Sequence, residues 1–393
     1  MRFHSSGERR NQASHPFRMV SDGTGQMTGY TWKERIKTLL KFCLYAASPL
    51  FSRRVSLDPR QARETLMAYS PKPAGSSFAD NKLLPPECDL QIVIPAYNVE
   101  EYLPACMESV LSQETKYSFR VVLVDDGSTD KTPQIADRYA SDSRVRVIHQ
   151  KNRGLSGARN TGLSELFGKY ILFLDSDDML CPGAIEAMLD TAFRYHCDLV
   201  EGGFYALYQN QTEEICHYGA DGVLSDPGQV LHGYAWGKVY AASLFRDRCF
   251  PEGYWYEDTV ISSLMIPAVQ TAGVTEKMVY VYRQNQAGIS LSSRGKPKAI
   301  DTYWITEQLM AEREKAGMAP DEAFFRYLLL QIRLNQNRIQ ELPQTIQESV
   351  FVLTCDLFCG AFPEEQNDRK NQVLIRALKN RDFGIYRICC KIF

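Results

Sequence analysis

Residues 170–180 read YILFLDSDDML, an apolar run that turns abruptly into a cluster of acidic side chains. Five apolar residues in succession, 170–174, indicate a strand buried on both faces, because alternate side chains of a strand point to opposite faces. Asp175, Asp177 and Asp178 follow at once. The sequence therefore places carboxylates at the rim of a hydrophobic core, where a cation or a cationic ligand would relieve their mutual repulsion.

Short apolar runs alternate with longer amphipathic segments between residues 89 and 203. This alternation is typical of parallel strands joined by crossover helices. The predicted strands are 90–94, 120–124, 145–149, 170–174 and 198–202. The predicted helices are 100–113, 132–140, 155–167 with Gly168 as its C-cap, and a fourth that begins at Pro182. We therefore expect an α/β fold, a mostly parallel and doubly wound sheet with helices on both faces.

The remaining sequence divides by composition into segments of different character. Polar residues predict disorder at the start, prolines and serines predict a linker, and the last hundred residues carry a mainly helical pattern. The predicted segments are 1–34 (disordered), 35–70 (amphipathic), 71–88 (linker), 89–290 (compact domain, with halves 89–205 and 206–290) and 291–393 (helical).

Charge and cysteine usage exclude several classes of protein. A formal net charge of −2 over 393 residues provides no general attraction to nucleic acid, and we expect no nucleic-acid partner. The eleven cysteines show neither a disulfide framework nor paired zinc-ligand spacings, which predicts a reduced, cytoplasmic chain. Cys355, Cys359, Cys389 and Cys390 are interpreted as small apolar residues.

Two basic amphipathic stretches, 35–54 and 374–393, leave two interpretations open. Each stretch either contacts the inner face of the cell membrane peripherally or packs on the protein core with its cations in solvent. No run of apolar residues is long enough for a membrane-spanning helix.

The residues that follow the predicted strands are the first candidates for a site, because ligands of open parallel sheets bind at the carboxyl ends of the strands. Polar residues follow three of the four strands concerned. These positions are Pro95, Ala96 and Tyr97; Asp125, Asp126 and Ser128; Asn152 and Gly154; and Asp175, Ser176 and Asp177. We expect them to meet at one edge of the sheet.

The DxD spacing of Asp175 and Asp177 lets both carboxylates face one site at the end of the strand. Hard oxygen ligands suit Mg²⁺ or Mn²⁺, and such an ion keeps open positions for phosphate oxygens. The pair therefore predicts a metal that holds a diphosphate. The alternative is a solvated turn in which Asp177 or Asp178 caps the next helix.

Four stretches, in this order and at these spacings, resemble the nucleotide-binding half of family 2 glycosyltransferases, which have the GT-A fold: IVIPAYNVEEYLPACMESVLSQ, VVLVDDGSTDKT, NRGLSGARNTGL and YILFLDSDD. The resemblance covers residues 90–205 closely and continues loosely to 290. It implies that Pro95, Ala96 and Tyr97 cradle the nucleotide base and that Asp125 hydrogen-bonds it. Asp175 would approach the ribose and the metal, and Asp177 would bind the metal directly.

The resemblance extends to neighbouring residues with more than one role open. Asp126 and Ser176 are candidates for the nucleotide site, although Asp126 and Ser128 equally suit a turn. Arg159 would pair with the metal-binding carboxylates or with the donor phosphates, because its planar fork fits either. A purely structural ion pair between Arg159 and an aspartate is the alternative.

The second half contains YWYEDTVISSLM (254–265), which resembles the family's acidic motif below the acceptor site. It implies Asp258 as general base with Glu257 as its support or as a sugar contact; a pair of helix N-cap residues is the alternative. Lys238 and Arg283 are expected beside the diphosphate. Trp236 and Trp255 would stack on a sugar or belong to the core.

The resemblance implies an inverting, Mg²⁺- or Mn²⁺-dependent glycosyltransferase of cell-envelope or capsule polysaccharide synthesis. It would move a sugar from a nucleotide-diphosphate sugar, with UDP as the expected nucleotide, to a glycan or polyprenyl-linked acceptor. A nucleotide-sugar-binding module without turnover is the alternative. A phosphoacceptor signalling domain is excluded because the first strand ends in Pro95–Ala96–Tyr97 rather than an acid pair, and a nucleotidyltransferase because no Gly-rich basic loop follows that strand.

Overall fold

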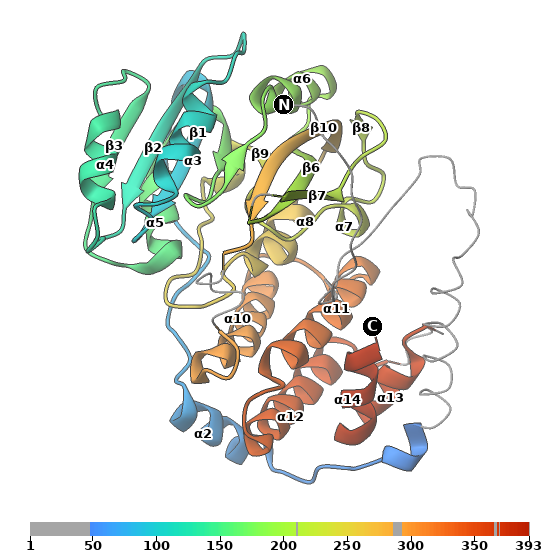
Figure 1. Ribbon diagram of the computed structural model, residues 1–393. Helices are drawn as coiled ribbons and strands as arrows, with labels where there is room; N and C mark the ends of the chain where they lie inside the picture. The colour runs from blue at the N-terminus through green and yellow to red at the C-terminus, as the bar shows by residue number, and fades with distance from the viewer. Residues whose placement is uncertain (1–47, 210, 286–292, 365–367, 369, 393) are drawn as a thin grey trace.

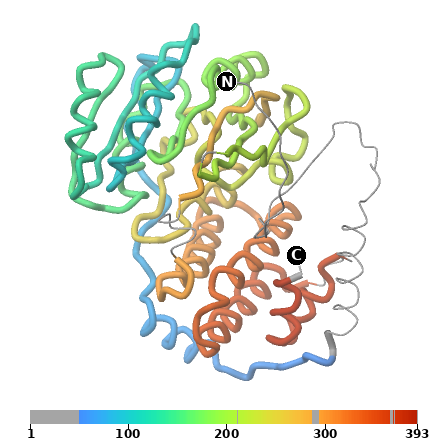
Figure 2. The backbone as a smooth tube through the Cα atoms, viewed as in Figure 1, coloured from blue at the N-terminus to red at the C-terminus, as the bar shows by residue number. Residues whose placement is uncertain are grey.

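The computed structural model describes residues 48–209, 211–285, 293–364, 368 and 370–392 (Figure 1). The expected disorder of 1–34, and the amphipathic stretch up to residue 47, lie outside these residues. Figure 2 traces the same backbone, in which a sheet with its helices is followed by a helical region that begins near residue 297.

One mixed sheet runs through the first part, in the strand order β3-β2-β1-β4-β9-β6-β10-β5. The first four strands are parallel, and β9 enters antiparallel between β4 and β6. The strands β1–β4 and β6 point the same way, as predicted, and β10, which was not predicted, is parallel to β6. The bounds are β1 (Lys82–Ala96), β2 (Phe119–Asp125), β3 (Val145–His149), β4 (Glu165–Phe173), β5 (Met179–Leu180), β6 (Leu199–Tyr208), β7 (Gln211–Cys216), β8 (Gly222–Val223), β9 (Lys238–Ala241) and β10 (Ala272–Arg283).

Both faces of the central strand β1 are covered. Leu90, Ile92 and Ile94 alternate with Gln91 and Val93, and all five side chains are fully buried. Because alternate residues face opposite sides, helices must cover the sheet on both sides. These helices are α3 (Leu103–Leu111), α4 (Thr132–Tyr139), α5 (Gly154–Leu163) and α6 (Ala184–Tyr195).

Three predicted boundaries need correction. The helix predicted for 155–167 ends at Leu163, and Gly168 lies inside β4, where a Cβ would stand 2.6 Å from the backbone nitrogen of Gln91. Close strand approach therefore explains this glycine, not a helix cap. The helix predicted to begin at Pro182 begins at Ala184, after a left-handed Gly183. The predicted linker is a strand from Lys82 onward.

Residues 71–81 form a strap between the two parts of the molecule (Figure 1). Ser76 donates from its hydroxyl to Glu312 (2.9 Å), and the Tyr254 hydroxyl donates to the carbonyl of Pro73 (2.7 Å). The strap thus binds both the helical region and the segment 246–258, and it is not a free linker.

The helical region has a hydrophobic core of its own. Phe351, Phe358, Tyr386, Cys389 and Cys390 are fully buried in it. Its helices are α10 (Asp301–Lys315), α11 (Glu322–Ile339), α12 (Gln344–Ala361), α13 (Gln372–Lys379) and α14 (Phe383–Ile392), and α2 (Pro59–Tyr69) packs on α12 from the other end of the chain. The remaining short helices are η1 (Ser48–Phe51), α7 (Pro227–Val230), η2 (Ala242–Phe245), η3 (Ile261–Met265), α8 (Ile266–Ala268) and η4 (Pro297–Ile300).

The two basic stretches differ in the structure. In the stretch 374–393, α13 buries Leu374 and Leu378, so packing accounts for its apolar face. Of the stretch 35–54 the structure describes residues 48–54, which contact α14 but leave Leu50 84% and Phe51 53% exposed, and membrane contact of this stretch stays a prediction. None of the described helices combines the length and hydropathy that crossing a bilayer requires.

Gly162 sets the distance between α5 and β1, because a Cβ at this position would meet Val93 Cγ1 at 2.4 Å. We expect Gly162→Ala to destabilise the fold by about 1–3 kcal/mol, the usual cost of overpacking. Gly360, in α12, has open space around it and serves as the matched control, since alanine there gains helix propensity. Thermal unfolding of both variants checks this; a Gly162→Ala protein as stable as wild type would contradict it.

Candidate active site

The end of β1 presents one exposed aromatic side chain beside buried backbone. Pro95 and Ala96 are buried, whereas 48% of Tyr97 is exposed. The backbone nitrogen of Asp126 donates to the carbonyl of Ala96 (2.8 Å), so the tips of β1 and β2 meet as predicted. An exposed ring at this edge is available to stack on a planar ligand.

Asp125, at the end of β2, is held by its neighbours and is almost fully buried. Its Oδ1 accepts from the Ser128 backbone nitrogen (3.1 Å), and its Oδ2 lies 2.8 Å from Nδ1 of His149. His149 Nε2 also lies 3.0 Å from Asp137 Oδ1. Hydrogen bonds to these two carboxylates raise the pKa of His149, so the imidazole holds Asp125 in place.

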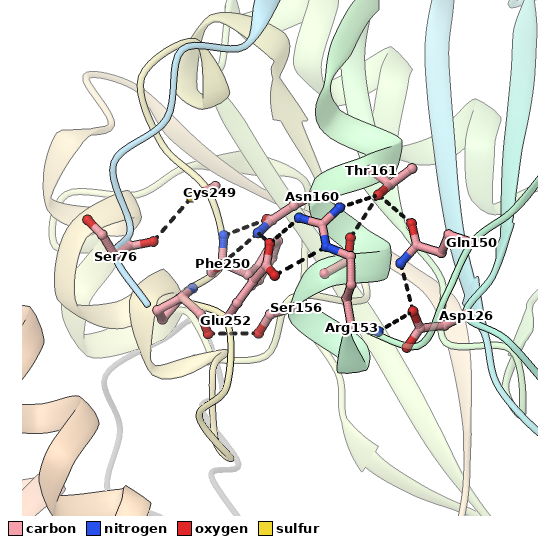
Figure 3. Close-up of polar contacts among 12 residues, drawn as sticks. Ser76, Asp126, Gln150, Arg153, Ser156, Asn160, Thr161, Cys249, Phe250 and Glu252 are labelled. Atoms are coloured by element: carbon pink, nitrogen blue, oxygen red, sulfur yellow. Dashed lines mark hydrogen bonds and ion pairs between the residues drawn. The ribbon is translucent and has the colours of Figure 1, made fainter. Parts of the chain in front are cut away.

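Asp126 belongs to a scaffold and not to the ligand edge (Figure 3). Its Oδ1 accepts from Gln150 Nε2 (2.7 Å) and from the Arg153 backbone nitrogen (2.8 Å), and 2% of the residue is exposed. Gln150 in turn accepts from Thr161 on α5 (2.6 Å). The predicted nucleotide contact of Asp126 is therefore corrected to the turn-shaping role that was the alternative.

The next segment of this scaffold fastens α5 to the chain at 249–252 (Figure 3). Asn160 Nδ2 donates to the Phe250 carbonyl (2.8 Å), and Asn160 Oδ1 accepts from the Phe250 nitrogen (2.9 Å). Ser156 donates to the Pro251 carbonyl (2.9 Å), and Arg153 pairs with Glu252. These contacts fix the segment that leads into Glu257 and Asp258.

The acidic cluster after β4 divides between two environments. Asp178 is 1% exposed, and its carboxylate accepts hydrogen bonds from the Tyr280 hydroxyl and from the Arg283 backbone nitrogen, both at 2.7 Å. Both donors belong to β10, so the Asp178 carboxylate is engaged by this strand. Asp177 accepts from Asn285 Nδ2 (3.1 Å), and Arg283 Nε donates to the Asp177 carbonyl (2.8 Å). Ser176, which lies between Asp175 and Asp177 in the sequence, is buried.

Asp175 and Asp177 remain as a pair of hard oxygen donors. Burial and then the charge of Asp175 raise the pKa of Asp177, which shows that the two carboxylates repel each other. A divalent cation would remove this repulsion, and carboxylate oxygens are the ligands that Mg²⁺ and Mn²⁺ prefer. The residues present therefore fit the predicted metal.

Arg159 joins the two halves of the site. This residue on α5 is 2% exposed, and its Nη2 and Nη1 lie 2.7 Å from Asp175 Oδ1 and from Glu257 Oε1. Burial opposes the charged guanidinium, but the carboxylates of Asp175 and Glu257 outweigh burial and raise the pKa of Arg159. The ion pair with Asp175 is present, and it suits the metal-site role and the purely structural role of Arg159 equally.

Glu257 and Asp258 lie in a turn that leads into η3. Glu257 is buried, and burial raises its pKa to about 7 against the opposing charge of Arg159. Asp258 is half-buried, and burial likewise raises its pKa, opposed first by Arg338 and then by Arg159. A partly accessible carboxylate with a raised pKa can accept a proton as a general base, because a raised pKa makes its deprotonated form a stronger base.

Lys238 does not extend toward a ligand, contrary to the prediction. Its Nζ lies 2.9 Å from Glu201 Oε2 and donates to the carbonyl of Tyr234 (2.9 Å), and 1% of the residue is exposed. Burial alone would raise the pKa of Glu201, but Lys238 and His232 lower it to about 2. Lys238 is thus the counter-ion of a buried glutamate.

Glu201, Cys216 and His232 bring one potential metal-ligand atom each within 4.8 Å of one another. This cluster is a weak metal candidate. Lys238 already neutralises the glutamate, and burial raises the pKa of the Cys216 thiol to about 11, whereas a metal ligand must be a thiolate. The cluster therefore forms a structural network of its own.

The two candidate sugar-stacking tryptophans, Trp236 and Trp255, differ in their burial. Trp236 is buried in a stack of rings between Tyr234 (4.4 Å between centroids) and Tyr280 (4.5 Å), which confirms the core alternative. Trp255 is half-buried beside the ammonium of Lys298.

The guanidinium of Arg283 lies over the Tyr102 ring next to the acidic cluster, where a diphosphate contact stays a prediction.

Sequence reasoning missed several residues that shape this site. His149 holds Asp125, and Tyr280 contacts Asp178 and the backbone of Asp175. Arg338 of the helical region lies over the ring of Tyr256, and its charge lowers the pKa of Asp258. His149 is the last residue of a predicted strand, which was a usable signal. Arg338 lies in an amphipathic helix far along the chain, and nothing in the sequence indicated its role.

A parallel sheet with a DxD pair at its carboxyl edge and an acidic turn beyond it defines the class as a transferase domain of the GT-A type. Residues 91–241 match the model of Glycosyl transferase family 2. This part of the chain is therefore a family 2 glycosyltransferase domain, which confirms the resemblance drawn from the four motifs.

Known proteins with related sequences are bacterial glycosyltransferases. Glycosyltransferase GlyA of Streptococcus pneumoniae serotype 4 is 30% identical over 218 residues, which are 51% of this chain and 31% of GlyA. The uncharacterized glycosyltransferase EpsJ of Bacillus subtilis strain 168 is 32% identical over 211 residues, 50% of this chain and 61% of EpsJ. The chain thus matches 31% of the length of one of these relatives and 61% of the other.

Among solved structures, residues 1–349 of TarS from S. aureus, crystallised with UDP-GlcNAc, have a similar fold. The TM-score is 0.51 at 20% identity, over 76% of this chain and 89% of that one. At this identity the similarity establishes the fold alone, and the fold agrees with the sheet described above.

Because Lys238 pairs with the buried Glu201, we expect substitution of Lys238 to lower the stability of the protein and not its affinity for a donor. Lys238→Met should destabilise the protein by about 3–5 kcal/mol, because it leaves a buried carboxylate without a counter-ion. The double variant Lys238→Met with Glu201→Gln should recover part of that loss. Thermal unfolding of the three proteins checks this, and a stable Lys238→Met protein with weakened donor binding would restore the diphosphate role.

Proposed function

We propose that the chain is a metal-dependent, inverting glycosyltransferase that transfers a sugar from a UDP-sugar to a glycan or polyprenyl-linked acceptor in envelope polysaccharide synthesis. The bridge from Asp175 through Arg159 to Glu257 supports this proposal, because two ion pairs of 2.7 Å join the acidic cluster after β4 to the acidic turn. The named relatives are glycosyltransferases, and the TarS complex makes UDP-GlcNAc the first donor to test.

Each strand tip has a proposed role in donor binding. Tyr97 stacks on the base, and Asp125, oriented by His149, accepts a hydrogen bond from it. Asp177 and Asp175 hold Mg²⁺ or Mn²⁺, which when bound neutralises charge on the leaving diphosphate. Arg283 adds a cation beside the same carboxylates.

Asp258 acts as the general base in the proposed reaction. The acceptor hydroxyl attacks the anomeric carbon from the face opposite the nucleotide, and Asp258 takes its proton as the bond to the diphosphate breaks. Glu257 is held by Arg159 and supports the turn or contacts the sugar. We place the reaction at the cytoplasmic side of the membrane, where nucleotide sugars and lipid-linked acceptors meet.

Donor binding tests the metal role of Asp177. Wild-type protein should gain thermal stability from UDP and UDP-sugars in the presence of Mn²⁺, and chelation should remove most of the gain. Asp177→Asn should weaken the Mn²⁺-dependent part about 10- to 100-fold, the range seen for weakened metal sites. Asp190→Asn, on the surface of α6, is the matched control. The absence of any shift with every donor would overturn the proposed function.

Replacement of the base separates an enzyme from a binding module. Asp258→Asn should lower transfer by about 10²- to 10⁴-fold, because the acceptor proton loses its carboxylate, while donor affinity stays within the range of wild type. Product formation from a radiolabelled donor and a parallel titration with UDP measure the two quantities. Unchanged turnover would remove Asp258 from the chemistry, and a wild-type protein that binds donors without any turnover would indicate the binding module.

A further inference from the structure

The turn that carries Glu257 and Asp258 is attached to the helical region and the strap as well as to the sheet. The backbone nitrogen of Trp255 donates to Asp301 Oδ2 (2.8 Å) at the start of α10. Lys298 donates to the Gly253 carbonyl, and the Tyr254 hydroxyl to the Pro73 carbonyl. The position of the turn therefore depends on elements outside the matched family domain.

Tyr256, inside this turn, has a left-handed backbone with φ +62°. A bulky side chain rarely adopts this conformation, and it persists only where surrounding contacts hold it. Arg338 of α11 supplies such a contact, because its guanidinium carbon lies 3.9 Å from the centroid of the Tyr256 ring. Arg338 Nη1 also donates to Thr302 Oγ1 of α10 (3.0 Å), which fixes the arginine itself.

On the basis of the proposed function, we propose that Arg338 is a positioning residue for Asp258, the base two residues beyond Tyr256. Its planar group clamps the strained turn, and its positive charge favours the ionised carboxylate that must accept the acceptor proton. The helical region thereby completes the active site. It is more than a support for the sheet.

Charged and titratable groups face Asp258 from several elements. Arg159 from α5 and Lys238 from β9 add positive charge, and Asp175 after β4 and the adjacent Glu257 add negative charge. Four phenols also lie within electrostatic reach: Tyr234, Tyr240, Tyr256 and Tyr327. Arg338 is the cation with the largest opposing effect on the burial that raises the pKa of Asp258.

The direction of the pH effect follows from this balance. Arg338 lowers the pKa of Asp258, so removal of its charge raises that pKa further above the ordinary value. Because the base acts in its deprotonated form, the acidic limb of the kcat/KM profile moves to higher pH. A residue that only supported the fold would lower activity and stability without moving this limb.

The experiment compares Arg338→Met, Arg338→Lys and Arg326→Met with wild type in the full chain, as kcat, KM and the pH profile of sugar transfer. Arg326 lies on the same helix about 18 Å away and pairs with Glu322 and Asp226, so its removal is a charge-matched control. Donor affinity and the unfolding midpoint are measured alongside.

Arg338→Met should lower kcat about 10- to 100-fold, the cost of a misplaced catalytic group, and should move the acidic limb up by about one pH unit or more, with donor affinity unchanged. Arg338→Lys should keep the limb near its wild-type position with a reduced kcat, because it keeps the charge and loses the planar clamp. Arg326→Met should behave as wild type.

An unmoved acidic limb in Arg338→Met, whether kcat falls with stability or stays at the wild-type value, would overturn the positioning role. If Arg338→Met does not fold, Arg338→Lys decides together with the unfolding midpoint: a reduced kcat at an unchanged midpoint and unchanged donor affinity supports the proposal. A wild-type kcat, or a kcat that falls together with the midpoint, overturns it. Wild-type protein without transfer to any acceptor would instead overturn the proposed function on which this inference rests.

Discussion

The buried guanidinium of Arg159 is the interaction on which the site depends. Removing such a charge from water is costly, and only partners of opposite charge with good geometry offset the cost. Asp175 from the end of β4 and Glu257 from the acidic turn provide them, each at 2.7 Å. Two segments that are 82 residues apart in sequence must therefore stay together for the arginine to remain paired. The side-chain amide of Asn160 makes two hydrogen bonds with the backbone of Phe250, and these hold α5 beside the chain segment that leads to Glu257.

The same bridge contributes to the charge balance around the acidic turn. Burial raises the pKa of Glu257 to about 7, and it also raises that of Asp258. Carboxylates this close to one another and to Asp175 would share protons without nearby cations. Arg159 acts on the donor side and Arg338 on the side of the helical region, so each half of the site contributes one arginine. Both arginines oppose the effect of burial on the pKa of Asp258, Arg338 more strongly than Arg159.

The sequence predicted the parts of the structure that depend on local pattern. Apolar runs located the strands, and the polar residues at their tips do lie at one edge, because strand direction determines where strand ends meet. Gly168 was misread because a glycine that permits close strand approach looks the same as a helix cap. Lys238 was misread because a lysine in a strand gives no sign of its partner, which is a glutamate on β6. Arg338 could not be found, since its contact with Tyr256 depends on how α11 packs beyond the sheet.

The family match covers residues 91–241, which include the strand tips of the donor side and exclude the acidic turn and the helical region. The scaffold of Asp126, Gln150 and Thr161 lies within this domain, whereas Arg283, which donates to the Asp177 carbonyl, lies beyond it. The turn at 254–258 takes its contacts from the strap, α10 and α11. Changes in the strap, α10 and α11 can therefore move the proposed base while the scaffold behind the strand tips keeps its local contacts.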